Sequence, residues 1–198
     1  MKTFLHVGCG PVKKSQIKGF NNDNWKEIRF DIDKNVKPDI EGTLTDMNLV
    51  NTGSVDAVYS SHNIEHVFPH EVPIVLREFH RVLKEDGIVV ITCPDLQSVC
   101  EAVVEDKLFE PLYVSPAGPI SPIDILYGHR DAIERGNEYM AHKCGFTYSS
   151  INSLFSNAGF KTRYGGRRPK KWDLFLVAFK QKKSEKEIYK IANPFFPT

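Results

Sequence analysis

The sequence lacks the features that would place it in several special classes. It contains no apolar run of about 18 residues, and it begins without a signal-peptide pattern. Its net charge is only +1, so no overall field would attract nucleic acid or a membrane surface. We therefore expect no membrane span, no nucleic acid among the partners and a cytoplasmic location.

Cysteine is also scarce. The four cysteines show no paired spacing such as Cys-x-x-Cys, which is typical of a structural metal site; they are Cys9, Cys93, Cys100 and Cys144. In a reducing compartment all four are expected to be free thiols. The sequence predicts no metal.

The chain has 198 residues, which is enough for one domain with a three-layer core. It shows no internal repeat and no low-complexity tract. We predict a single domain over residues 1–180, with residues 109–146 as a substrate-side insert or lid and residues 181–198 as a C-terminal tail.

The first ten residues indicate a ligand site. An apolar run, Thr3 to Val7, stops at Gly8-Cys9-Gly10. A strand that ends in Gly-x-Gly lets the backbone come close to a ligand, because no Cβ intervenes. A second run ends at Asp31, and an acid at the tip of a neighbouring strand can accept hydrogen bonds from ribose hydroxyls. The pattern predicts a nucleoside site at the carboxyl edge of a parallel sheet, with Asp33 as an alternative ribose ligand.

The missing residues narrow the choice of nucleoside. A dinucleotide site carries a third glycine where this chain has Lys13, and a phosphate-binding Gly-Lys-Ser/Thr is also absent. A cofactor with a ribose but no phosphate fits better. S-adenosylmethionine is the prime candidate.

Hydrophobic periodicity predicts alternating strands and helices. Strands are expected at 3–8, 26–32, 39–44, 54–61 and 88–92, with little helical pattern between Gly10 and Lys26. A helix is expected over 70–86, ended by Gly87. Central strands that are apolar throughout favour a parallel α/β sheet.

The second half completes the sheet. Four prolines in 109–122 predict a loop or lid, and 123–140 is predicted to be helical in part. Thr147 is a candidate N-cap for a helix that Gly159 closes. Strands at 161–164 and 172–179 are predicted to form a hairpin across a basic turn at 165–171.

Five segments in sequence order then resemble class I S-adenosylmethionine-dependent methyltransferases. They are Leu5–Gly10, Phe30–Asp33, Asp46–Val58, Ser60–Val67 and Leu76–Gly87, with Asn157–Phe160 resembling the turn into the last strands. The resemblance implies a Rossmann-like three-layer sandwich, with a mostly parallel seven-stranded sheet and a terminal antiparallel hairpin. The short first helix resembles a poorly characterised bacterial subgroup, some of whose members are associated with surface-glycan pathways.

The resemblance also implies a set of cofactor-binding residues: Gly8, Cys9, Gly10, Asp31, Ile32, Asp46, Met47, Ser61 and His62. The glycine turn would pass beside the carboxypropyl arm, and Asp31 would hold the ribose. Asp46 would take the adenine amino group, Met47 would cover the ring, and Ser61 and His62 would lie beside the sulfonium. His6 stands where the family commonly has an acid, which alters a usual anchor for the methionine amino group.

Candidate acid–base residues are His62, His66, His129 and His142. Methyl transfer needs a base only if the acceptor must lose a proton, so capping or packing is the alternative reading of each histidine. The leading hypothesis is methyl transfer to an O or N nucleophile of a small-molecule or glycan-like acceptor. The alternatives are a non-catalytic S-adenosylmethionine- or nucleoside-binding module and an RNA methyltransferase that uses the basic turn.

Overall fold

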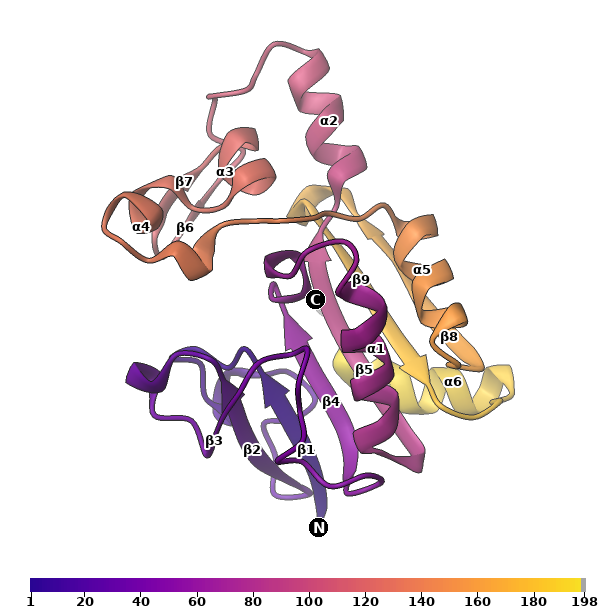
Figure 1. Cartoon of the computed structure of the whole chain (residues 1–198). Helices are drawn as coiled ribbons and strands as arrows, with labels where there is room; N and C mark the ends of the chain where they lie inside the picture. Colours follow the sequence, from indigo (N-terminus) through magenta and orange to yellow (C-terminus); the bar gives the residue numbers. More distant parts are fainter. Residues whose placement is uncertain (197–198) are drawn as a thin grey trace.

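The computed structural model describes residues 1–196 (Figure 1). Seven strands form one sheet in the order β3-β2-β1-β4-β5-β9-β8. Their bounds are β1 Lys2–Val7, β2 Trp25–Asp31, β3 Ile40–Glu41, β4 Val55–Ser61, β5 Leu83–Pro94, β8 Thr162–Arg168 and β9 Asp173–Phe179. The first five strands are parallel, and β9 runs antiparallel to both β5 and β8. The predicted α/β sheet with a terminal antiparallel hairpin is confirmed.

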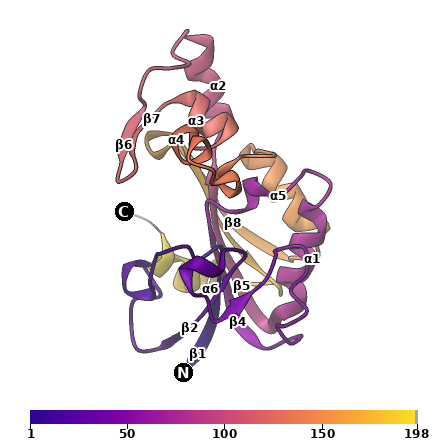
Figure 2. The ribbon, with the colours of Figure 1, turned by 60° about the vertical axis from the view of Figure 1, so that its left-hand side comes forward.

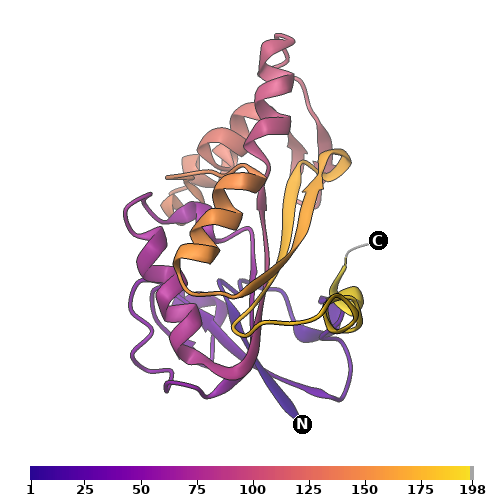
Figure 3. The ribbon, with the colours of Figure 1, turned by 90° about the vertical axis from the view of Figure 1, so that its right-hand side faces the viewer.

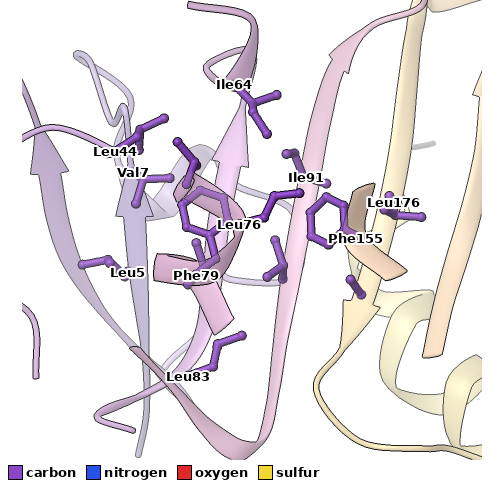
Figure 4. Close-up of a cluster of buried hydrophobic side chains, with 14 of the residues drawn as sticks. Leu5, Val7, Leu44, Ile64, Leu76, Phe79, Leu83, Ile91, Phe155 and Leu176 are labelled. Atoms are coloured by element: carbon purple, nitrogen blue, oxygen red, sulfur yellow. The ribbon is translucent and has the colours of Figure 1, made fainter. Parts of the chain in front are cut away.

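Alternating side chains place a separate hydrophobic core on each face of the sheet. On β1, Leu5 and Val7 join the core under helices α1 (Val72–Val82) and α5 (Tyr148–Asn157) (Figure 4). Phe4 points the other way, into a core with Phe20 and Phe195. Burial on both faces accounts for the apolar runs of β5 and β9.

Helix α1 is shorter than predicted. It ends at Val82, and Leu83 already begins β5, so the prediction that Gly87 ends a helix over 70–86 is wrong. The pairing of β4 with β5 shifts between Val55 and Ala57, which makes room for the residues before Ile88. A Cβ at Gly87 would lie 2.8 Å from the Leu83 side chain, so this glycine permits a tight return of the chain. A glycine is needed here because the Leu83 side chain and the Lys84 carbonyl leave no room for a Cβ, and not because it caps a helix.

The space of the missing first helix is filled by the C-terminal segment. Between β1 and β2 the regular structure is one short 3-10 helix, Lys14–Gln16, as predicted. Helix α6 (Glu185–Ala192) and the turn Asn193–Phe195 lie on that face of the sheet, opposite α1 and α5 (Figure 3). The Phe195 ring stands 4.8 Å from that of Phe20. Residues predicted as a tail therefore contribute to a core, although 197–198 lie outside the described residues.

The insert stands above the carboxyl edge of the sheet (Figures 1 and 2). It includes α3 (Pro122–Tyr127) and α4 (Arg130–Glu134), and α2 (Leu96–Val104) leads into it from β5. The segment 109–122, predicted as a loop, contains a small hairpin of β6 (Tyr113–Ser115) and β7 (Gly118–Ile120). The Thr147 cap of α5 is confirmed, since its side chain accepts from the Ser150 N–H.

None of the helices within residues 1–196 combines the length and hydrophobicity that crossing a membrane requires.

Candidate active site at the carboxyl edge of the sheet

Strand register brings the predicted cofactor residues together. Val7, just before the glycine turn, pairs with Phe30 on one side and Ser60 on the other. Asp31, Gly8 and Ser61 therefore lie at the carboxyl ends of three adjacent strands, along one edge of the sheet. Next along this edge, Ser61 pairs with Thr92, and Pro94 pairs with Asp173 at the start of β9.

Two side chains of β2 hold the glycine turn by hydrogen bonds. Gly8 and Gly10 have φ angles of 58° and 48°, in the left-handed region that favours glycine. The Gly10 N–H donates to Oδ2 of Asp31 over 2.8 Å. The guanidinium of Arg29 donates to the carbonyl oxygens of Gly10 and Val12. Strand β2 thus fixes the turn through two side chains.

The two candidate ribose ligands have different local roles. Asp31 is buried, and its Oδ1 accepts from the Asp33 N–H while Oδ2 accepts from Gly10. Asp33 instead caps the short helix Lys34–Val36 by accepting from the Asn35 N–H. Each carboxylate oxygen can accept a second hydrogen bond, so Asp31 keeps capacity for a ribose hydroxyl.

The Asp46–Met47 segment is pinned against α1. The Met47 N–H donates to Glu78, and Arg81 donates to the Met47 carbonyl. The Met47 side chain is fully buried, which leaves no exposed surface to cover an adenine ring. Asp46 is exposed and lines a hollow of about 410 Å³ beside α1, which contains neither the glycine turn nor Asp31. Ile32, directly after Asp31, is 45% exposed and offers the apolar surface that Met47 does not.

His62 lies between two carboxylates at the tip of β4. Its Nδ1 is 3.5 Å from Oε1 of Glu65, and its Nε2 is 3.7 Å from Oδ2 of Asp173. Desolvation lowers the pKa of His62, but Asp173 and Glu65 outweigh it and raise the pKa to about 9. A histidine with that pKa is protonated at neutral pH, so it carries a positive charge between the two carboxylates instead of accepting a proton.

A cavity of about 150 Å³ opens beside His62. One wall is polar, with Ser61, Thr92 and Asp173. The remaining walls come from the loop after β1, the inner strands and the C-terminal segment: Ile17, Lys18, Tyr59, Val90, Arg168, Phe175 and Phe195. The cavity therefore lies between the carboxyl edge of the sheet and the C-terminal segment that contains Phe195.

Comparison with known proteins agrees with this geometry. Residues 5–91 match the family model described as "Methyltransferase domain". The match covers less than half of the chain, from β1 into β5, and it supports the resemblance to class I S-adenosylmethionine-dependent methyltransferases. No match is found among curated proteins.

Solved structures share the fold of this chain at low sequence identity. A Pyrococcus horikoshii protein is 14% identical with a TM-score of 0.60, over 90% of this chain and 81% of its own. A SAM-dependent methyltransferase of Archaeoglobus fulgidus is 13% identical with a TM-score of 0.56, over 90% and 86%. The 1,6-didemethyltoxoflavin-N1-methyltransferase of Burkholderia thailandensis, solved with S-adenosylhomocysteine, is 14% identical with a TM-score of 0.54, over 91% and 72%.

The family model and these structures support S-adenosylmethionine as the cofactor. The glycine turn fits it: a Cβ at Gly10 would meet no heavy atom within 4 Å, so this side of the turn faces open space. A Cβ at Gly8 would instead collide with the Asn63 side chain. Gly8 therefore serves packing, and Gly10 leaves room for a ligand.

His6 does not face the cofactor edge as a free anchor. It is 2% exposed, and its Nδ1 lies 2.7 Å from Oε1 of Glu27 on β2. Burial lowers the pKa of His6, and the Glu27 carboxylate counteracts part of that effect. The family's usual acid is thus replaced by a buried histidine–glutamate pair.

The remaining candidate histidines separate into two places. His66 and His142 lie together, with ring centroids 4.8 Å apart, although one follows β4 and the other ends the insert. His129 instead caps α4, where its Nδ1 accepts from the Ala132 N–H. Between the two candidate histidines of the insert, His142 therefore lies beside His66, which follows β4, and His129 does not.

The basic turn proves to be largely internally paired. Strand β8 extends through Arg168, so the arginines lie in a strand instead of a loop. Arg167 pairs with Asp95, and Arg168 pairs with Asp173. Arg163 donates to Asn152 and to the Phe160 carbonyl.

Three residues at this edge were missed by sequence reasoning: Arg29, Asn63 and Asp173. Asn63 lies within a segment that the resemblance covers and Arg29 lies just before one, but their partners are distant in sequence. Asp173 reaches His62 only through the antiparallel return of β9. The sequence signal for Asp173 was its position as an acid at the start of the otherwise apolar strand β9.

Proposed function

We propose that the protein transfers the methyl group of S-adenosylmethionine to an oxygen or nitrogen nucleophile of a small polar acceptor, with a glycan-like compound included in that class. The observation that carries the proposal is the placement of Asp31, Gly10 and Ser61 at the carboxyl ends of three adjacent strands, with open space over Gly10. Asp31 would hold the ribose, Ile32 would cover the adenine, and the sulfonium would lie towards Ser61.

The acceptor would approach through the cavity beside His62. Its walls combine aromatic and aliphatic side chains with the polar atoms of Ser61, Thr92 and Asp173. Such a mixture suits a small compound with a hydroxyl or amine group. The Burkholderia protein, a 1,6-didemethyltoxoflavin-N1-methyltransferase, supports this acceptor class. In-line displacement at the methyl carbon is then accelerated chiefly by positioning.

The test begins with calorimetric titration of S-adenosylmethionine and S-adenosylhomocysteine into the wild type, Asp31→Asn and Asp33→Asn. We expect Asp31→Asn to weaken binding tenfold or more, about 1.4 kcal/mol, and the matched Asp33→Asn to change it little. The reverse order would make Asp33 the ribose ligand. Failure of the wild type to bind either compound would refute the proposal.

Turnover is tested separately, by mass-spectrometric detection of S-adenosylhomocysteine and a methylated product with a panel of amino and hydroxyl compounds. The second candidate, a non-catalytic binding module, is favoured by the burial of His6 and its pairing with Glu27. Saturable cofactor binding without product for any acceptor would support that module.

A further inference from the structure

We propose that Glu65, His66 and His142 form a binding site for a divalent transition-metal ion of the Zn²⁺ class. The sequence predicted no metal, since its cysteines lack a paired spacing and no other local ligand pattern was identified. His142, which reaches this place from the far end of the insert, changes that assessment. One ligand atom from each of the three residues lies within 4.8 Å of the others.

The glutamate is the first independent observation. Glu65 is 0% exposed, and within residues 1–196 neither of its carboxylate oxygens has a hydrogen-bond partner. Burying an ionised carboxylate without hydrogen bonds is costly, so such groups are normally paired or bound to a metal. Its Oε1 lies 3.5 Å from Nδ1 of His62. His66 and His142 also lie beside the carboxylate.

The rings of His66 and His142 are oriented by backbone carbonyl groups, as those of metal-binding histidines usually are. Nδ1 of His66 is 3.0 Å from the Ala141 carbonyl, and Nδ1 of His142 is 2.7 Å from the Ile125 carbonyl. A carbonyl oxygen can only accept, so Nδ1 carries the hydrogen in both rings and Nε2 keeps its lone pair. A backbone carbonyl that orients a ligating imidazole in this way is a recurrent feature of metal sites.

The backbone fixes the two halves of the site together. The N–H groups of Lys143 and Cys144 both donate to the Glu65 carbonyl, at 2.8 and 3.2 Å. The segment after His142 is thus attached to the turn Ile64–His66 by main-chain bonds. Two ligands bound at about 2.1 Å in tetrahedral geometry stand about 3.4 Å apart, so small side-chain rotations would close the site.

The ligand types select the ion. Two imidazoles and one carboxylate suit Zn²⁺ and its neighbours in the first transition row, whereas Mg²⁺ and Ca²⁺ prefer oxygen ligands alone. Three protein ligands leave a coordination position for water or another small ligand. The ion would join the insert to the tip of β4, whether or not the protein transfers methyl groups.

The experiment is isothermal titration of ZnCl₂ into chelator-treated, dialysed full-length protein, with Co²⁺ absorption spectra in parallel. We expect one ion per chain, weakened roughly 100-fold or more by His142→Gln and by Glu65→Gln. His70→Gln, an exposed histidine outside the cluster, is the matched control and should bind like the wild type. Excess Mg²⁺ should not compete.

Circular dichroism and melting of the metal-free variants establish that they are folded. The Co²⁺ form should show ligand-field bands without a sulfur-to-cobalt charge-transfer band. The proposal is overturned if the wild type binds no ion, if folded His142→Gln binds as tightly as the wild type, or if a charge-transfer band shows that cysteines hold the ion.

Discussion

A Cβ placed on Gly8 would lie 2.2 Å from Cγ of Asn63, so the glycine turn and the segment after β4 are packed directly on one another. The adjacent strands β1 and β4 are therefore joined by this side-chain contact as well as by backbone hydrogen bonds. The amide nitrogen of Asn63 is buried, so it has little room to withdraw.

Gly8→Ala should destabilise the fold by about 1–3 kcal/mol, since it combines a left-handed φ with this overlap. Gly10→Ala carries a similar backbone strain without a collision, so it should cost less stability while its methyl group obstructs the cofactor. Urea denaturation and cofactor titration separate the two effects. Asn63→Ala should recover part of the stability of Gly8→Ala, and no recovery in the double variant would contradict the packing explanation.

Arg29→Met should weaken S-adenosylmethionine binding about tenfold while the protein stays folded. The variant loses the charged donor that holds the carbonyls of Gly10 and Val12, and hydrogen bonds from charged groups contribute about 1.5–3 kcal/mol. Calorimetric titration measures the change. Lys26→Met, at an exposed position of the same strand, is the control and should leave affinity unaltered.

Glu78 should make stability depend on pH in the acid range. Its pKa is lowered, chiefly by the Arg81 side chain and further by the Met47 N–H, against the effect of burial. A carboxyl with a depressed folded pKa stabilises the protein above its unfolded pKa of about 4.3, and this stabilisation is lost as pH falls through the folded pKa.

Glu78→Gln should therefore cost up to about 1 kcal/mol at pH 7, a value limited by partial exposure of the pair. The difference from the wild type should shrink as the pH falls below 5. Denaturation curves at several pH values measure it. The exposed Glu41→Gln should show no such trend, and a constant difference for Glu78→Gln would refute the assignment.

Phe195→Ala should destabilise the protein by about 2–4 kcal/mol, because the ring is buried against Phe20 and Trp25. It should also widen the cavity beside His62, which this ring helps to line. Thermal melting provides the first measurement. Tyr189→Ala, an aromatic residue on α6 that is 64% exposed, should change the melting temperature little.

The parallel sheet could be predicted because its central strands are apolar runs between clear turns. The glycine turn and Asp31 could be predicted because they lie in one short local pattern. Met47 shows the limit of such patterns: its position after β3 indicates the cofactor, but Glu78 and Arg81 turn its segment towards the core. The proximity of His66 and His142 could not be predicted from local sequence patterns, since it depends on how the insert folds back.

The exchange of a first helix for a C-terminal segment changes the order in which this fold can be completed. In the described chain, Phe20 and Trp25 border the loop that follows the glycine turn, and their cover, Phe195, is made some 170 positions later. During synthesis, this face of β1 and β2 must therefore remain solvent-exposed until almost the whole domain has emerged. Contacts of such long sequence separation slow folding and prolong the exposure of apolar surface. Cofactor binding is accordingly expected to be a late event in the life of the nascent chain.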